Sequence, residues 1–187
     1  MKEYIAQKYQ KSGAVFLGVV HRLDRPTSGI VVFARTSKAL VRLNKLFSER
    51  QTTKTYWAIT MQLPENTSEK LTHYLKRNQK QNKSYAYPKE VSESKKAVLT
   101  YTLIKKLDRY GLLEIDLETG RHHQIRAQLA AIGCPIKGDL KYGFNRSNKD
   151  GSIHLHARKL SLIHPVKKEE LIIIAPPPND PIWNACI

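Results

Sequence analysis

Residues 21–29 read His-Arg-Leu-Asp-Arg-Pro-Thr-Ser-Gly, so a single carboxylate, Asp24, lies between two arginines. An apolar approach, Val15 to Val20, precedes these residues, and an apolar run, Ile30 to Ala34, follows them. A carboxylate between two segments of buried type is costly to desolvate unless a cation pairs with it, and a nearby arginine also keeps it charged. We therefore expect Asp24 to be a paired and oriented carboxylate, which can act as a nucleophile or as a base.

The other apolar runs are short and rich in residues that favour strands. Together with the two runs around Asp24, they predict an α+β fold with a mainly antiparallel mixed sheet and flanking helices. The segments expected to form strands are Ala14–Val20, Gly29–Ala34, Tyr56–Met61, Ala97–Ile104, Leu112–Leu117, Ile153–His156 and Leu171–Ala175.

Two segments have the features of helices. Thr36 can cap a helix whose apolar stripe runs from Leu40 to Phe47. A second helix is expected to begin near His122 and to end at Gly133. The polar segment Lys106–Gly111 is typical of a hairpin connection between two strands.

Residues 62–96 differ from the rest because they are basic, poor in aliphatic side chains and interleaved with tyrosines. We interpret them as a surface arm or a pair of irregular strands that could follow an RNA backbone and stack on unpaired bases. A solvated loop is an equally good interpretation of the same composition.

The composition indicates a polyanionic partner. The chain has 187 residues, with 32 Lys and Arg against 16 Asp and Glu, which gives a formal net charge of +16. Such a charge favours binding to phosphates, although it does not separate RNA from DNA or an anionic membrane, and a basic solvated surface remains an alternative. The two cysteines form no metal or disulfide pattern, and no apolar segment is long enough to span a bilayer, so we expect a cytoplasmic protein.

Neither a metal nor a nucleotide cofactor is expected. The seven histidines lack a ligand set of suitable spacing, since the adjacent His122 and His123 point in different directions on a helix. The chain also contains no glycine-rich phosphate loop.

Four motifs in chain order resemble the RluA-type pseudouridine synthases, which convert uridine in RNA to its C-linked isomer. His21–Gly29 resembles the signature of that family, and Thr53–Ala58 its Lys-x-Tyr-x-Ala strand. Thr119–Arg126, continued through Gly138-Asp139 and Tyr142-Gly143, resembles the third motif, and Leu155–Pro165 the closing strands. Because the four matches are colinear, a chance match of one short pattern does not explain them.

The resemblance implies three catalytic residues, Asp24, Tyr56 and Arg126. Arg126 aligns with the arginine of the family's Gln-Ile-Arg motif, and its planar fork can hold the Asp24 carboxylate in one orientation. Tyr56 matches the tyrosine that stacks on the target base and assists proton removal from C5. The alternative for Arg126 is a structural surface ion pair on a helix. The alternative for Tyr56, favoured without the resemblance, is a core tyrosine with a satisfied hydroxyl.

A base inside a helix cannot reach a buried carboxylate, so the uridine must be extruded. By resemblance Arg22 holds the flipped state, but in an extended segment it could instead be a permanent partner of Asp24. Ile125 is expected to close the pocket over the base and exclude water. The further residues expected to bind the RNA substrate are His21, Thr27, Lys54, Arg121 and Gln124.

We expect residues 1–187 to form a single catalytic domain, active as a monomer without cofactor or metal on ribosomal or transfer RNA. The family usually places a strand and a Lys-Pro loop, and often an S4-like domain, ahead of its signature, and neither is recognisable before His21. A non-catalytic RNA-binding or RNA-chaperone module on the same fold is the alternative. A hydrolytic glycosidase or nucleosidase using Asp24 is a third possibility, disfavoured because a second carboxylate is not evident.

Overall fold

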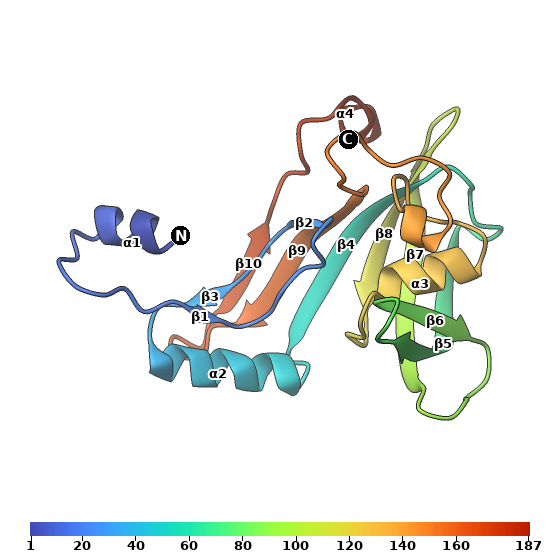
Figure 1. The fold of residues 1–187 in the computed structure, drawn as a ribbon. Helices are drawn as coiled ribbons and strands as arrows, with labels where there is room; N and C mark the ends of the chain where they lie inside the picture. The colour runs from blue at the N-terminus through green and yellow to red at the C-terminus, as the bar shows by residue number, and fades with distance from the viewer.

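The computed structural model describes residues 1–187 and contains one large, mainly antiparallel sheet with a few helices, which confirms the α+β prediction (Figure 1). The strand order is β10-β9-β4-β8-β7-β5-β6, and the short β2 runs parallel to β9. These strands are β2 (Ser28–Gly29), β4 (Thr52–Thr60), β5 (Ser68–Asn78), β6 (Lys83–Tyr87), β7 (Lys95–Lys106), β8 (Gly111–Leu117), β9 (Leu155–Ile163) and β10 (Glu170–Ile174).

Both faces of the sheet centre are covered, because β8 has apolar residues on each side. Leu113 and Ile115 pack in the main core with Ile125 and Leu129 of α3 (Gln124–Ala131). Leu112 faces the other way and packs against Trp183 of α4 (Pro181–Cys186). The C-terminal helix α4 thus packs on one face of the sheet, and α3 lies on the other face against β5 and β6, with its apolar side chains in the main core.

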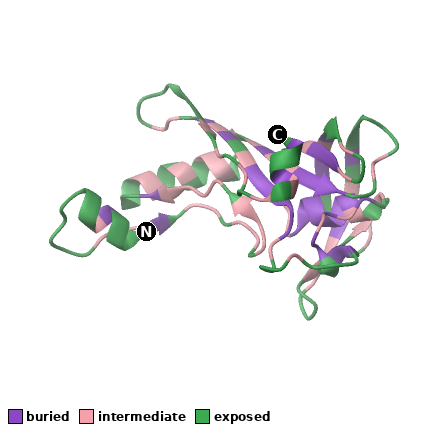
Figure 2. Cartoon of the chain, turned by 90° about the horizontal axis from the view of Figure 1, so that it is seen from above, coloured by how far each residue is buried: buried purple, intermediate pink, exposed green.

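The N-terminal part is much thinner. It contains α1 (Lys2–Lys8), β1 (Gly18–Val19), β3 (Phe33–Ala34) and α2 (Ser37–Ser48). The predicted cap of α2 is confirmed, since Thr36 Oγ1 accepts a hydrogen bond of 3.1 Å from Ala39 N. Figure 2 shows that the buried residues gather in the sheet, whereas α1 and α2 are mostly exposed.

The two long strands predicted on either side of the Asp24 motif are wrong. Two residues of the first run pair with two of the second, as β1 with β3, and Gly29 pairs with β9 together with Ser28 as the short β2. An apolar run becomes a long strand only where a neighbouring backbone is available along its length, and here β1 and β3 have only each other.

Residues 62–96 contain a regular hairpin instead of irregular strands or a loop. β5 pairs with β6 on one side and with β7 on the other. Its aliphatic residues are few but well spaced, since Leu71 and Leu75 are both buried while the three residues between them are half-buried or exposed. The predicted Lys106–Gly111 connection is confirmed by the Leu107 N to Tyr110 O hydrogen bond of 2.8 Å.

The predicted second helix is also confirmed, with a later start. α3 begins at Gln124, because His123 has a left-handed backbone with φ of 53° and cannot continue a helix. The helix ends before Gly133, whose φ of +75° is the conformation that glycine favours after a helix. No helix in the structure has the length and apolar character needed to cross a bilayer.

Candidate active site

All the residues expected at the site line one open cleft of about 250 Å³. Residues from all four motifs meet there, although they are far apart in the sequence. The motif residues that line it are His21, Arg22, Leu23, Asp24, Thr27, Lys54, Tyr56, Gly120, Arg121, His123, Gln124, Ile125, Arg126 and Leu155.

Asp24 lies in a turn between β1 and β2, not between two long strands. Thr27 N donates a hydrogen bond of 2.9 Å to Asp24 O, which closes the turn. The side chain of Asp24 is 29% exposed, so the carboxylate is partly buried but open to the cleft. A substrate in the cleft can therefore reach it.

Arg126 joins Asp24 to a second, fully buried carboxylate. Its Nη1 donates to Asp24 Oδ2 at 3.3 Å. Its Nε and Nη2 bind both oxygens of Asp139 at 2.7 and 2.8 Å. The predicted pairing of Arg126 with Asp24 is thus present, but the shorter, bidentate contact is with Asp139.

This arrangement keeps Arg126 charged and fixed. Burial alone would lower the pKa of Arg126, but the hydrogen bonds and negative charge of Asp139, with a smaller contribution from Asp24, raise it. A bidentate arginine and carboxylate pair has one preferred geometry. The one Nη1 group left over is therefore presented to Asp24 in a constant direction.

His123 also faces Asp24, with Nε2 at 3.6 Å from Oδ2. Its pKa is lowered to about 3, first by burial and then by the positive charge of Arg126, so the ring is neutral at physiological pH. Its Nδ1 forms a hydrogen bond of 3.0 Å with the hydroxyl of Tyr142. His123 thus packs against Asp24 without forming a second ion pair.

Tyr56 comes from β4, where the pairing with β9 shifts register between Thr55 and Tyr56. Its ring packs on the main core and lines the cleft, whereas Trp57 points to the other face and donates to Glu114. Burial, with a contribution from the Asp24 charge, raises the pKa of Tyr56 to about 12. The phenol is therefore protonated at neutral pH and can donate a hydrogen bond.

Arg22 is exposed at the cleft and forms no ion pair with Asp24, so its interpretation as a permanent partner is wrong. The segment is not an extended strand, and Asp24 pairs with Arg126 instead. Ile125 is buried and contributes an apolar wall. Thr27 Oγ1 is buried with no hydrogen-bond partner.

His21 and Gln124 line the cleft, and each forms hydrogen bonds within the protein. His21 Nε2 accepts from Val32 N at 3.1 Å, and its ring stacks on Phe47. Gln124 Oε1 accepts from Thr119 Oγ1 and from Arg121 N at 2.8 and 3.0 Å, while its Nε2 donates to a carbonyl of β7. Both side chains shape the cleft.

Lys54 and Arg121 lie where the cleft opens into a second groove of about 510 Å³. Arg121 Nε donates to Lys96 O at 3.0 Å, and this bond does not involve the two terminal nitrogens of its guanidinium. Lys54 has no carboxylate within salt-bridge distance. Both cations are thus placed to receive an anionic group.

Sequence reasoning gave no role to Asp139, and it considered His123 only as a metal ligand. Asp139 is 2% exposed, and its partner Arg126 precedes it by thirteen residues. The available signal was Gly138-Asp139 in the third motif, where an acidic residue stands among residues of buried type. The described side chains form no group of three or more metal-ligating residues.

Comparison with known proteins agrees with this geometry. The family model described as RNA pseudouridylate synthase matches residues 1–131. The chain is 31% identical over 183 residues to tRNA pseudouridine synthase C of Vibrio vulnificus, covering 88% of this chain and 73% of that protein. It is 35% identical over 164 residues to an uncharacterized RNA pseudouridine synthase of Synechocystis, covering 86% of this chain and 50% of that protein.

The fold agrees as well. The human protein RNA Pseudouridylate Synthase Domain Containing 4 superposes with a TM-score of 0.78 and 25% identity, covering 97% of this chain and 79% of that one. The chain spans about half the length of several relatives that it matches. With most of its length matched by the family model, and with the four motifs around one cleft, this chain belongs to the RNA pseudouridylate synthase family.

Proposed function

We propose that this chain isomerises uridines in RNA to pseudouridine, with Asp24 as the catalytic carboxylate. The observation that carries the proposal is the contact of 3.3 Å between Asp24 and Arg126 inside the cleft. The reaction breaks the N1–C1′ glycosidic bond of uridine, turns the uracil while it stays bound, and joins C5 to the ribose C1′; the proton on C5 is then lost and N1 gains one. One oriented carboxylate is sufficient because uracil leaves as a stabilised anion.

The second carboxylate of the site does not support hydrolysis. Ordinary glycoside hydrolysis uses one carboxyl group as an acid and another as a nucleophile or base. Both oxygens of Asp139 are bound to Arg126, and the side chain is buried. Asp139 is thus a positioning residue for Arg126, which leaves Asp24 as the only carboxylate open to substrate.

The other residues of the cleft have complementary roles in this proposal. Tyr56 stacks on the extruded uracil and donates a hydrogen bond, since its phenol is protonated at neutral pH. Ile125 covers the base and excludes water from the intermediate. Arg22, exposed at the cleft, holds the flipped state of the RNA, and Thr27 shapes the turn that presents Asp24.

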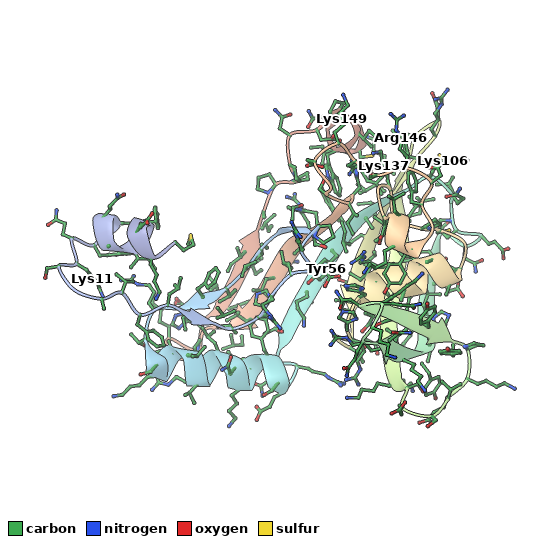
Figure 3. All side chains as sticks on the ribbon, viewed as in Figure 1. Lys11, Tyr56, Lys106, Lys137, Arg146 and Lys149 are labelled. Carbon is green, nitrogen blue, oxygen red and sulfur yellow. The ribbon has the colours of Figure 1, made fainter.

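The substrate we propose is structured RNA of the ribosomal or transfer class. One relative is named tRNA pseudouridine synthase C, and the net charge of +16 favours a polyanion. Figure 3 shows Lys106, Lys137, Arg146 and Lys149 gathered at one end of the molecule beyond Tyr56, which supports contact with more than one nucleotide. A cytosolic location and a monomeric state remain predictions.

Release of tritium from RNA labelled at uracil C5 tests the reaction class. Release by the wild-type chain that is lost in Asp24→Asn supports isomerisation. Appearance of free uracil identifies a hydrolase, and RNA binding without tritium release identifies a non-catalytic binding module. Either of these last two results contradicts the proposal.

A further inference from the structure

We propose that the groove beside the catalytic cleft binds the phosphodiester that joins the target uridine to one neighbouring nucleotide. We call it the flanking groove. This inference rests on the proposed function and adds a second subsite to it. The side chains that carry it are Arg50, Lys54 and Arg121.

The flanking groove is continuous with the cleft that contains Asp24. Phe47, Lys54, Leu117, Gly120 and Arg121 line both. A Cβ added to Gly120 would lie 3.8 Å from Lys54 Nζ, so the ammonium group sits beside this turn at the junction of the two hollows. A nucleotide in the cleft would therefore direct one of its phosphates toward Lys54.

Lys54 and Arg50 have no carboxylate partner in the groove. Lys54 is partly buried next to Arg50, and both burial and the Arg50 charge lower its pKa. No carboxylate lies within 4.0 Å of either cation. Two like charges kept together in a partly buried groove repel each other, and an anion between them removes that repulsion.

The single acidic residue in the groove is already neutralised. Glu118 pairs with Lys70 at 2.6 Å. The three cations that line the groove, Arg50, Lys54 and Arg121, match the acceptor oxygens of a phosphodiester.

A phosphodiester fits better than a base or a small metabolite. Only two of the eleven lining residues are hydrophobic, and one of these, Phe47, already stacks on His21. A base would need a free stacking surface, whereas the groove offers charge and hydrogen-bond donors. Its connection to the Asp24 cleft places the anion one backbone unit from the reacting sugar.

The test removes a charge from the groove, from one phosphate of the RNA, or from both, and measures RNA affinity. The probe is a single-stranded RNA of about nine nucleotides with one central uridine in an adenosine background, a length typical of single-strand binding sites. Neutral methylphosphonates replace the phosphates on the two sides of the uridine, one at a time. Affinity is measured for the wild-type chain and for Lys54→Gln, Lys54→Arg, Arg50→Gln and Lys11→Gln.

We expect one methylphosphonate to weaken wild-type binding by roughly tenfold, which is typical of a charged hydrogen bond. Lys54→Gln should bind the unmodified RNA with an affinity lower by the same factor, and that methylphosphonate should not weaken its binding further. Its salt dependence, as the slope of log affinity against log salt, should fall by about 0.7. Lys54→Arg should restore both properties, and the exposed Arg50→Gln should show the same pattern more weakly.

Lys11→Gln removes one charge in the N-terminal part, which Figure 3 shows well away from Tyr56 in the cleft, and should keep the wild-type response. The inference is overturned if the effects of Lys54→Gln and of both methylphosphonates are additive, or if Lys11→Gln reduces affinity equally. Because RNA binding is measured without turnover, the affinity result does not depend on the outcome of the tritium assay. If Lys54→Gln is insensitive to the methylphosphonate but the wild-type chain does not isomerise uridine, only the proposed function is contradicted.

Discussion

The carboxylate and the cation of the site come from two very different parts of the molecule. Arg126 belongs to α3, whose residues Gln124 to Leu129 are all buried and packed on the sheet. Asp24 belongs to the segment between β1 and β2, where the two strands have only two residues each. The cation is therefore part of the core, whereas the carboxylate is held by a thin loop.

A few backbone contacts dock this loop on the core. Ile30 N donates to Ala157 O at 3.1 Å, and Ile153 N donates to Pro26 O at 3.0 Å. Gly29 lies against Ala157 with φ of +116°. The difference between the two regions suggests a division of roles: the core fixes the direction of the arginine, and the loop brings the carboxylate to it.

The largest effect on stability is expected from weakening the contact between Arg126 and Asp139 in the core. Asp139→Asn removes the charge that Arg126 binds with two hydrogen bonds, and it leaves a buried cation with only Asp24. We expect the free energy of unfolding to fall by about 3–5 kcal/mol. Denaturant unfolding measures this, with the exposed Asp108→Asn as control, and equal stability of the two variants would contradict it.

On the loop side, Gly29→Ala should undock the segment that carries Asp24. A Cβ at this position would lie 2.4 Å from Ala157 O, and the positive φ adds backbone strain. We expect a stability loss of about 2–3 kcal/mol together with a lower turnover. Gly13→Ala is the matched control, since a Cβ there meets no atom within 4 Å; a similar loss in both variants would refute the docking role.

Arg126→Lys keeps the positive charge of the core cation but removes its planar guanidinium. A lysine ammonium cannot bind Asp139 through a planar fork while also directing a donor at Asp24. Turnover should fall by about ten- to a hundredfold, with a smaller change in RNA affinity. Steady-state kinetics and a binding titration separate the two quantities, and a loss confined to affinity would speak against an orienting role.

The smallest effect concerns His123, the second side chain that the core places against Asp24. Its pKa is lowered to about 3, so in acid the unfolded chain takes up a proton that the folded chain does not. His123 therefore costs stability progressively as the pH falls from about 6.5 toward 3. His123→Asn keeps a residue that tolerates the left-handed backbone and should narrow the stability difference between pH 7 and pH 5.

This prediction is checked by denaturant unfolding at the two pH values. If the wild-type chain and His123→Asn lose equal stability on acidification, the neutral buried ring is not a source of acid sensitivity.

The sequence predicted features that depend on local chemistry. The Thr36 cap, the Lys106–Gly111 hairpin and the end of α3 at Gly133 follow from the preferences of neighbouring residues, and all three are present. The predicted long strands around Asp24 failed because their pairing depends on which distant backbone lies alongside, and no local pattern contains this information.

The same limit, that long-range contacts are not visible in the sequence, applies to the site. The motif resemblance predicted that Asp24, Tyr56 and Arg126 lie in one site, and all three line the same cleft. The role of Asp139 was missed, because it arises only when the short turn after α3 folds back and delivers a carboxylate to Arg126. For residues 62–96 a pair of strands was one of the interpretations, but its regular pairing was missed because few aliphatic residues mark it, mainly the two buried leucines of β5.

The chemistry assigned to the loop carboxylate is tested by Asp24→Ala on an RNA that the wild-type chain modifies, with turnover and affinity measured side by side. Turnover should be abolished while RNA binding stays within a few-fold, because the cleft and its cations remain. An Asp24→Ala variant that still modifies RNA at the normal rate would show that another group performs the reaction.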